Sequence, residues 1–542
     1  MARIELLLAV IAFINQCFAE TSVAVTTSLG QVTGYVANFG DDTAQLYHGR
    51  ADVFLGVPYA QPPVGALRFK KPQPIANLQG VYNSQPKVCP QLRKKADEMS
   101  EDCLKLNIFS PNVSATVKYP VMLWIHGGSF MSGAASDYNV DGVVSNFVSH
   151  DVVVVVIQYR LGALGFFTTQ SDEFPANLGM LDQVEAIKFV RQHIDKFGGD
   201  ANRLTVFGFS AASAHTYSPL SQSLFQQAIV HSNPIMTSLD GYFGRDKVSE
   251  KFAKAICDID FPAKGEKLTK LDQCLAQKSV QQMVDFDKTV FEWKMSIDNY
   301  FLTGMPNETF QQRPNIPVIM GNCKDEWSFV DLFKMARGMA TLNSYDKTSV
   351  EKTLLERSAY YGQNAQKVME FVVGKYKPEG TTDNDHLAWL KIKSNVLTAA
   401  GFTSVMALDA SYYIQNQNPN VFMYEFDYSS AVGRKYEVPG WKPVPHYAEI
   451  PLLWKQNSAW TKAKAGVVPA DYEVANHLGE MWTTFAKTGF KCDRTENCPV
   501  WTAVPVGQDK MPYNSIDQQQ SMQADFRQKD REVFLKEVPN LL

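Results

Sequence analysis

The chain has 542 residues, of which 45% are apolar and 20% are charged, so it can bury a large core. Its formal net charge of −4 gives no overall basic character of the kind that binds nucleic acid or a membrane through many basic residues. We therefore expect no nucleic-acid partner.

The first nineteen residues predict a secretory signal. They contain a basic residue, a short apolar run and a small residue, Ala19, before Glu20. The run is too short to span a bilayer comfortably, although a retained anchor is an alternative. No other segment reaches membrane length, and the last residues carry no lipid-anchor or retention pattern. We expect a protein of residues 20–542, secreted or in the lumen of the secretory pathway, without a stable membrane anchor.

Sequons and cysteines fit that compartment. Asn112 and Asn307 each begin an N-glycosylation sequon. Cys17 lies in the expected signal, and three pairs among the other cysteines are close enough to close short loops: Cys89–Cys103, Cys257–Cys274 and Cys492–Cys498. A loop of about 15 residues gains about 3 kcal/mol from such a bond. Cys323 is left over, and a buried apolar role is favoured over a reactive thiol.

Apolar runs of strand length recur along the chain, at residues 121–125, 152–157, 204–209, 228–231, 316–320 and 421–424. Amphipathic helical patterns, such as residues 181–197, lie between several of them. Such an order indicates an α/β fold with a mostly parallel central sheet and helices on both faces. Residues 31–36 alternate instead and predict an antiparallel N-terminal edge. No linker marks a boundary, so we expect residues 20–542 to form one domain.

The run at 204–209 leads directly into Ser210-Ala211-Ala212-Ser213. Small residues around one serine permit the sharp strand-to-helix elbow that lifts a hydroxyl above a sheet, where a base can reach it. The usual elbow reads G-x-S-x-G, whereas Ala212 occupies the last place here. Ser210 is the candidate nucleophile.

A serine nucleophile needs a base, and an acid that orients the base. Glu326 follows the predicted strand at 316–320, and His446 follows the one at 421–424. Both stand after strand ends, where open sheets of this type place their sites. His446 would take the proton of Ser210, and Glu326 would hold the imidazole. The alternatives are Asp325 as the acid, and His215 or His231 as the base.

A second loop could stabilise negative charge. The run at 121–125 ends in His126-Gly127-Gly128-Ser129. The amides of Gly127, Gly128 and Ser129, with that of Ala211 after the serine, would receive a carbonyl oxygen as it becomes negative. A single donor of this kind is worth about 10² to 10³ in rate.

At these residues the chain resembles the type-B carboxylesterase and cholinesterase family of α/β-hydrolases, and is closest in character to a secreted carboxylesterase of invertebrate type. Four further stretches are similar to family motifs: residues 54–69, 100–108, 177–183 and 197–203. The resemblance covers nearly the whole mature chain. It implies the α/β-hydrolase fold, no cofactor or metal, a triad of Ser210, Glu326 and His446, and the disulfides Cys89–Cys103 and Cys257–Cys274.

Two departures from the family pattern bear on activity. The segment after Ser210 is about four residues short, roughly one helical turn. A serine displaced by ~1 Å would lose on the order of 10²-fold in rate. Phe209 stands where the family commonly has a glutamate, and the loop from Cys89 to Cys103 lacks the tryptophan that helps relatives hold a cationic head. Neutral esters are therefore favoured over choline esters.

The leading hypothesis is a secreted serine carboxylesterase that hydrolyses small or lipid-like carboxylic esters through an acyl-enzyme intermediate. The alternative is a catalytically inactive adhesion or binding protein on the same fold, similar to neuroligins. The competent residues at all three triad positions favour the enzyme, whereas the short elbow favours the alternative. The sequence assigns no oligomeric state.

Overall fold

The computed structural model describes residues 21–209, 213–243, 247–434, 436–490 and 501–542. Within these ranges thirteen strands form one sheet in the order β1-β2-β3-β5-β7-β6-β8-β9-β10-β11-β12-β13, with β4 beside β2. The strands are β1 Ser22–Thr27, β2 Gly30–Asn38, β3 Arg50–Pro58, β4 Gly80–Val81, β5 Lys105–Ser110, β6 Tyr119–Ile125, β7 Val153–Ile157, β8 Gly199–Phe209, β9 Gln227–His231, β10 Val318–Cys323, β11 Val421–Phe426, β12 Tyr513–Ile516 and β13 Ser521–Gln523.

The centre of the sheet is parallel, from β7 through β6, β8, β9, β10 and β11 to β12. Strands β1, β2, β3 and β5 pair antiparallel and form the N-terminal side. The predicted mostly parallel sheet with an antiparallel N-terminal edge is confirmed. Several boundaries differ from the predicted runs: β8 begins at Gly199 rather than at Leu204, β11 ends at Phe426 rather than at Tyr424, and β10 begins at Val318 rather than at Ile316. Pro317 precedes it and has no N–H to give to a ladder.

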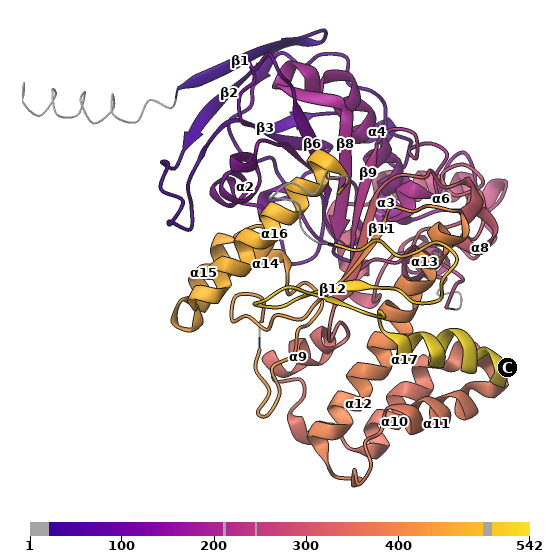
Figure 1. The fold of residues 1–542 in the computed structure, drawn as a ribbon. Coiled ribbons are helices and arrows are strands. Elements are labelled where there is room, and N and C mark those ends of the chain that lie inside the picture. Colours follow the sequence, from indigo (N-terminus) through magenta and orange to yellow (C-terminus); the bar gives the residue numbers. More distant parts are fainter. Residues whose placement is uncertain (1–20, 210–212, 244–246, 435, 491–500) are drawn as a thin grey trace, which may run out of the picture.

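Helices cover both faces of the sheet (Figure 1). They are α2 Val140–Asn146, α3 Gly162–Phe166, α4 Leu178–His193, α5 Val248–Cys257, α6 Glu266–Gln277, α7 Val280–Phe286, α8 Pro306–Thr309, α9 Ser328–Ala336, α10 Lys347–Arg357, α11 Ala365–Tyr376, α12 His386–Thr398, α13 Ser404–Gln415, α14 Ile450–Leu453, α15 Asn457–Ala463, α16 Pro469–Thr488 and α17 Gln528–Arg531. Alternate residues of the strands point to opposite faces. Leu123 and Val206 pack on the side of α4 and α13, whereas Trp124 and Phe207 pack on the side of α14 and α16.

A further apolar cluster lies among the helices inserted between β10 and β11. It joins Leu332 of α9, Leu354 of α10, Val372 of α11 and Leu390 of α12 with residues near the C-terminus, including Val533. Figure 1 shows these helices gathered beside α17 and the C-terminus. No helix of the described ranges has both the length and the apolar character that crossing a bilayer requires.

Two of the three expected disulfides are present. Cys89 bonds Cys103 with an S–S distance of 2.01 Å, and Cys257 bonds Cys274 at 2.09 Å. Cys323 is a free, buried cysteine. The expected pair of Cys492 and Cys498 lies outside the described residues, as do residues 1–20 with the expected signal.

Candidate active site

The carboxyl ends of β10 and β11 bring the predicted acid and base together. His446 Nδ1 lies 2.6 Å from Glu326 Oε2, and the His446 N–H donates to the Glu326 backbone oxygen at 3.1 Å. The other carboxylate oxygen, Oε1, accepts hydrogen bonds from Ser232 Oγ at 2.6 Å and from the Cys323 N–H at 2.7 Å. A carboxylate held by three donors can orient an imidazole and stabilise its cation.

Ser210 and Ala211, the predicted nucleophile and the amide after it, lie outside the described residues. The residue before them, Phe209, ends the buried strand β8. Its ring centroid is 4.3 Å from that of the His446 imidazole. The residue immediately before Ser210 therefore packs against the imidazole of His446.

The alternative acid and bases are engaged elsewhere. Asp325 Oδ2 accepts from the Val444 N–H at 2.9 Å, and the Asp325 N–H donates to the Val444 oxygen at 2.9 Å, so Asp325 fastens the loop that carries His446. His215 is buried between Gln183 and Ser221, and burial lowers its pKa to about 3. His231 Nδ1 lies 3.0 Å from the hydroxyl of Tyr424.

The imidazole of His446 is surrounded by aromatic rings. The rings of Phe402 and Phe329 lie 5.2 and 5.3 Å from the imidazole of His446, in addition to that of Phe209. The Glu326 side chain is completely buried. Burial raises the pKa of Glu326 above its ordinary value, and the charge of His446 opposes that rise. Because a charge interacts more strongly in a low dielectric, these rings strengthen the contact between imidazolium and carboxylate.

The loop after β6, which carries the predicted oxyanion donors, has an unusual backbone. Gly128 has a φ of +122°, and the following residues Ser129 and Phe130 also have positive φ. The Trp293 N–H donates to the Ser129 oxygen at 3.3 Å, and the Gly162 N–H donates to the Phe130 oxygen at 2.7 Å. These bonds fix the carbonyl groups of the loop. Among the hydrogen bonds of the described residues, none has the N–H of Gly127, Gly128 or Ser129 as its donor.

A second buried carboxylate lies behind the pair. Glu449 Oε2 accepts from the Cys323 thiol at 2.8 Å, and Oε1 lies 3.7 Å from His231 Nδ1. Burial acts to raise the pKa of Glu449, but its contacts with His231 and Cys323 outweigh burial and hold that pKa below its ordinary value. Burial also raises the pKa of the Cys323 thiol, as the interpretation of an unreactive buried residue predicts.

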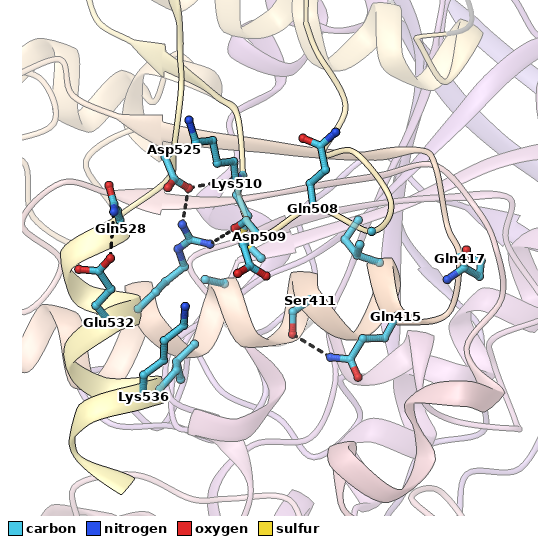
Figure 2. A pocket seen from close by; sticks show the side chains of 16 residues that line it. Ser411, Gln415, Gln417, Gln508, Asp509, Lys510, Asp525, Gln528, Glu532 and Lys536 are labelled. Atoms are coloured by element: carbon cyan, nitrogen blue, oxygen red, sulfur yellow. Dashed lines mark hydrogen bonds and ion pairs between the residues drawn. The ribbon is translucent and has the colours of Figure 1, made fainter. Parts of the chain in front are cut away.

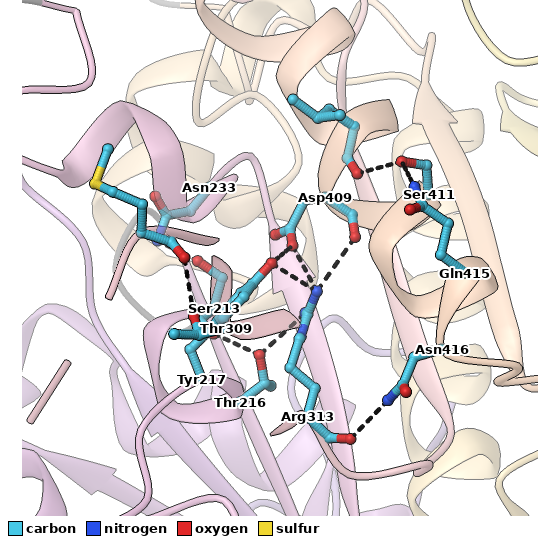
Figure 3. A network of polar contacts seen from close by, with 12 residues as sticks. Ser213, Thr216, Tyr217, Asn233, Thr309, Arg313, Asp409, Ser411, Gln415 and Asn416 are labelled. Atoms are coloured by element: carbon cyan, nitrogen blue, oxygen red, sulfur yellow. Dashed lines mark hydrogen bonds and ion pairs between the residues drawn. The ribbon is translucent and has the colours of Figure 1, made fainter. Parts of the chain in front are cut away.

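The short segment after the nucleophile position is anchored by a buried ion pair (Figure 3). Arg313 Nη1 donates to Asp409 Oδ1 of α13 at 2.7 Å, and both side chains are fully buried. The same guanidinium donates to Tyr217 Oη at 2.9 Å and to Thr216 Oγ1 at 3.0 Å. Thr216 ends a 3₁₀ helix, Ser213–Thr216, that starts three residues after Ser210. This contact ties the shortened segment to α13.

A separate cleft lies away from this pair (Figure 2). It measures about 770 Å³, lies between α13, α17 and the chain near Lys510, and is lined by residues such as Ser411, Asp525 and Glu532. It shares no residue with the Glu326–His446 pair, and we assign it no part in the chemistry. Nowhere in the described ranges do three or more His, Cys, Asp or Glu side chains form a group that could hold a metal ion.

The site also contains residues that were not predicted from the sequence: Ser232, Glu449, Phe329 and Phe402. Ser232 follows β9 directly, so the strand-end rule that selected Glu326 could also have selected it. Glu449 stands three residues after His446, but spacing alone does not indicate a buried carboxylate. The two phenylalanines carried no signal, because they occur in ordinary helical patterns.

Comparison with known proteins gives consistent matches. Residues 21–534 match the carboxylesterase family. Human carboxylesterase 3 is 31% identical over 503 residues, which cover 86% of this chain and 83% of that protein. Gut esterase 1 of Caenorhabditis briggsae is 28% identical over 516 residues, covering 90% and 87%. The acylcarnitine hydrolase of Rattus norvegicus is 29% identical over 558 residues, covering 98% and 94%.

Proposed function

Because the chain belongs to the carboxylesterase family, we propose that it is a serine carboxylesterase that hydrolyses carboxylic esters through an acyl-enzyme intermediate. The 2.6 Å contact between His446 Nδ1 and Glu326 Oε2, packed against the residue before Ser210, is the observation that carries the proposal. The relatives named above are hydrolases by name, which does not favour an inactive adhesion protein.

In the proposed reaction, Ser210 Oγ attacks the ester carbonyl while His446 Nε2 takes its proton. The carbonyl oxygen becomes negative and is received by the amides of Gly127, Gly128, Ser129 and Ala211. Collapse of this intermediate breaks the bond to the alcohol, which leaves with the proton from His446. Water then attacks the acyl-serine by the same route and releases the acid. Glu326 keeps Nδ1 protonated throughout, so that Nε2 can act as the base.

The proposed substrates are neutral carboxylic esters with apolar groups. Three phenyl rings surround the imidazole of His446, and one of them, Phe209, takes the place of the family's glutamate. Apolar acyl or alkyl groups bury favourably against such rings. A quaternary ammonium group would find neither that glutamate nor the tryptophan of the first disulfide loop.

We also propose that residues 1–19 are a secretory signal and that residues 20–542 form one secreted domain. The Cys89–Cys103 and Cys257–Cys274 bonds support passage through an oxidising compartment. Asn112 and Asn307 are both exposed, as glycan acceptors must be. The Cys492–Cys498 bond belongs to the same proposal. Tryptic mass mapping of the secreted protein, with and without glycosidase, tests the removal of the signal, the disulfide bonds and the glycans.

A fluorophosphonate probe tests the catalytic assignment. We expect it to label Ser210 in the purified protein, and Ser210→Ala to lose both the label and the hydrolysis of p-nitrophenyl acetate. His446→Gln should lower kcat by at least about 10³-fold with little change in KM. Ser221→Ala, at a buried serine whose hydroxyl lies 3.0 Å from His215 Nδ1, is the matched control and should keep the label. Folded protein that ignores the probe and turns over no ester would overturn the proposal.

A further inference from the structure

We propose that a basic and aromatic surface beside the catalytic pair docks the protein onto anionic lipid surfaces. We call this surface the Arg–Phe rim and define it as Arg93, Phe291, Phe333, Arg337 and Arg357. Its purpose, the delivery of lipid-borne esters, rests on the proposed esterase function. Docking itself can be measured without any turnover.

A chain of ring contacts leads from the site to the rim. The imidazole of His446, whose side chain is 13% exposed, lies 5.3 Å from the ring of Phe329. The ring of Phe329 lies 6.3 Å from that of Trp327. The guanidinium of Arg357, from the end of α10, covers Trp327 at 5.0 Å and Phe291 at 5.2 Å. Phe291 is 55% exposed, so this path ends in solvent.

Helix α9 provides a second path. Phe329 and Phe333 are one turn apart on α9 and therefore share a face of that helix. Phe333 is 40% exposed and lies between two guanidinium groups, Arg337 at 4.3 Å and Arg93 at 5.1 Å. Arg93 comes from the loop closed by the Cys89–Cys103 bond. Four segments of the chain thus contribute to the surface: the Cys89–Cys103 loop, the stretch that carries Phe291, α9 with the residue after it, and the end of α10.

The charge of this surface is opposite to that of the whole chain. Segments 91–99, 333–339 and 355–360 together carry six basic and three acidic side chains, whereas the formal net charge of the protein is −4. Among the described residues, no carboxylate lies within ion-pair distance of Arg93, Arg337 or Arg357. Their guanidinium groups stack on rings, which leaves planar N–H donors for phosphate or carboxylate groups.

An anionic lipid surface matches this combination better than a soluble partner does. Unpaired basic side chains are attracted to anionic headgroups, and half-exposed aromatic rings partition into the headgroup region. Phe291 and Phe333 come from separate segments and are 55% and 40% exposed, so both rings can enter an interface. Esters with long apolar chains reside in such surfaces, and docking places them next to the rings around His446.

Vesicle sedimentation of the full-length secreted protein tests the proposal. We expect binding to vesicles of phosphatidylcholine mixed with phosphatidylserine, weaker binding to phosphatidylcholine alone, and release at high salt. Each basic side chain at such a surface is worth a factor of about five, so the triple variant R93Q/R337Q/R357Q should lose about 100-fold in partitioning. The variant F291S/F333S should also bind less, although its charge is unchanged.

The matched control is K264Q/K462Q/K464Q, which removes three exposed charges from other elements and should leave partitioning unchanged. Thermal unfolding of each variant shows that it is folded. Equal binding to the two vesicle types, or a triple variant that binds like the wild type, would overturn docking. Release of the wild type by soluble glycerophosphoserine would reassign the rim to a small anionic ligand. Docking without hydrolysis of p-nitrophenyl acetate would refute the esterase proposal alone.

Discussion

Gly128 shows how one residue fixes the shape of the proposed oxyanion loop. Its φ of +122° is strained for any residue with a side chain, and a Cβ would lie 2.1 Å from the Ser132 backbone oxygen. We therefore expect Gly128→Ala to lower the free energy of unfolding by about 2 kcal/mol or more, and kcat/KM for p-nitrophenyl acetate by at least about 10²-fold.

The control for that substitution is Gly374→Ala on α11. A Cβ there has no neighbour within 4 Å, and the position is helical and exposed. Alanine should increase stability by about 0.5–1 kcal/mol and leave turnover unchanged. If urea unfolding and esterase assays gave the same result for both variants, the backbone of Gly128 would not be special.

Asp287 makes stability depend on pH. It is 2% exposed, accepts from Trp293 Nε1 at 2.8 Å, and burial raises its pKa to about 7. At pH values between the pKa of Asp287 in the unfolded chain and about 7, Asp287 is protonated in the folded state and ionised in the unfolded state. The contribution of Asp287 to the free energy of unfolding therefore falls as pH rises. Asp287→Asn removes that dependence.

Urea unfolding at pH 5 and pH 8 measures the effect of Asp287. The free energy of unfolding of the Asn variant minus that of the wild type should rise by about 2–3 kcal/mol from pH 5 to pH 8. Every other titrating group cancels in this comparison. A difference that stays constant with pH would mean that Asp287 keeps an ordinary pKa.

At the residue level, the Glu326–His446 pair could be predicted from the sequence, but the contacts that hold the pair in place could not. Glu326 and His446 could be found because each follows an apolar run at a strand end. Ser232 also follows a strand end, but its bond to Glu326 could not be predicted, nor could the bond between Cys323 and Glu449. These contacts join residues far apart in the chain, Ser232 to Glu326 across 94 positions and Cys323 to Glu449 across 126. Such pairings depend on the register of neighbouring strands, which a single sequence does not contain.

At the level of elements, the 3₁₀ helix Ser213–Thr216 is held in place by a buried ion pair between two residues outside that helix, Arg313 and Asp409. Removing only one partner of a buried pair leaves an uncompensated charge and typically costs about 3–5 kcal/mol. We expect this loss for Arg313→Met, because Asp409 would remain buried, and Tyr217 and Thr216 would also lose a donor.

The double variant Arg313→Met/Asp409→Leu provides the decisive comparison. With both charges gone, most of the lost stability should return, since an apolar replacement of similar volume is often neutral. A double-mutant cycle from chemical denaturation gives the coupling energy. Single and double variants that all lie within about 1 kcal/mol of the wild type would show that the pair does not anchor this segment.

The elements themselves were predictable to different degrees. Continuous apolar runs predicted the parallel strands, and the alternation at residues 31–36 predicted the antiparallel edge. The predicted helix at 181–197 is α4 Leu178–His193 followed by a 3₁₀ turn, Ile194–Phe197. The packing of α9–α12 against residues near the C-terminus was not predicted, because their apolar faces do not identify a partner.

For the whole molecule, we expect one cooperative unit from residue 20 to 542. The two large apolar clusters share every central strand, and the cluster among α9–α12 is completed by Val438 and Val533, which come from later segments. Calorimetry should therefore show one unfolding transition, with a van't Hoff enthalpy close to the calorimetric one. A separate early transition that removes only the helices between β10 and β11 would divide the chain into two units.

The order of the sheet has a consequence for how such a protein can diversify. Five consecutive strands, β6, β8, β9, β10 and β11, supply every loop of the proposed active centre within a width of about 20 Å. The long excursions at residues 235–312 and 328–415 leave the same border without interrupting it. Selection for new ester preferences, in nature or in a library, can therefore change the parts of those excursions that do not contact the proposed active centre. The residues in them that support it must be kept: Trp293, Phe329, Phe402 and Asp409.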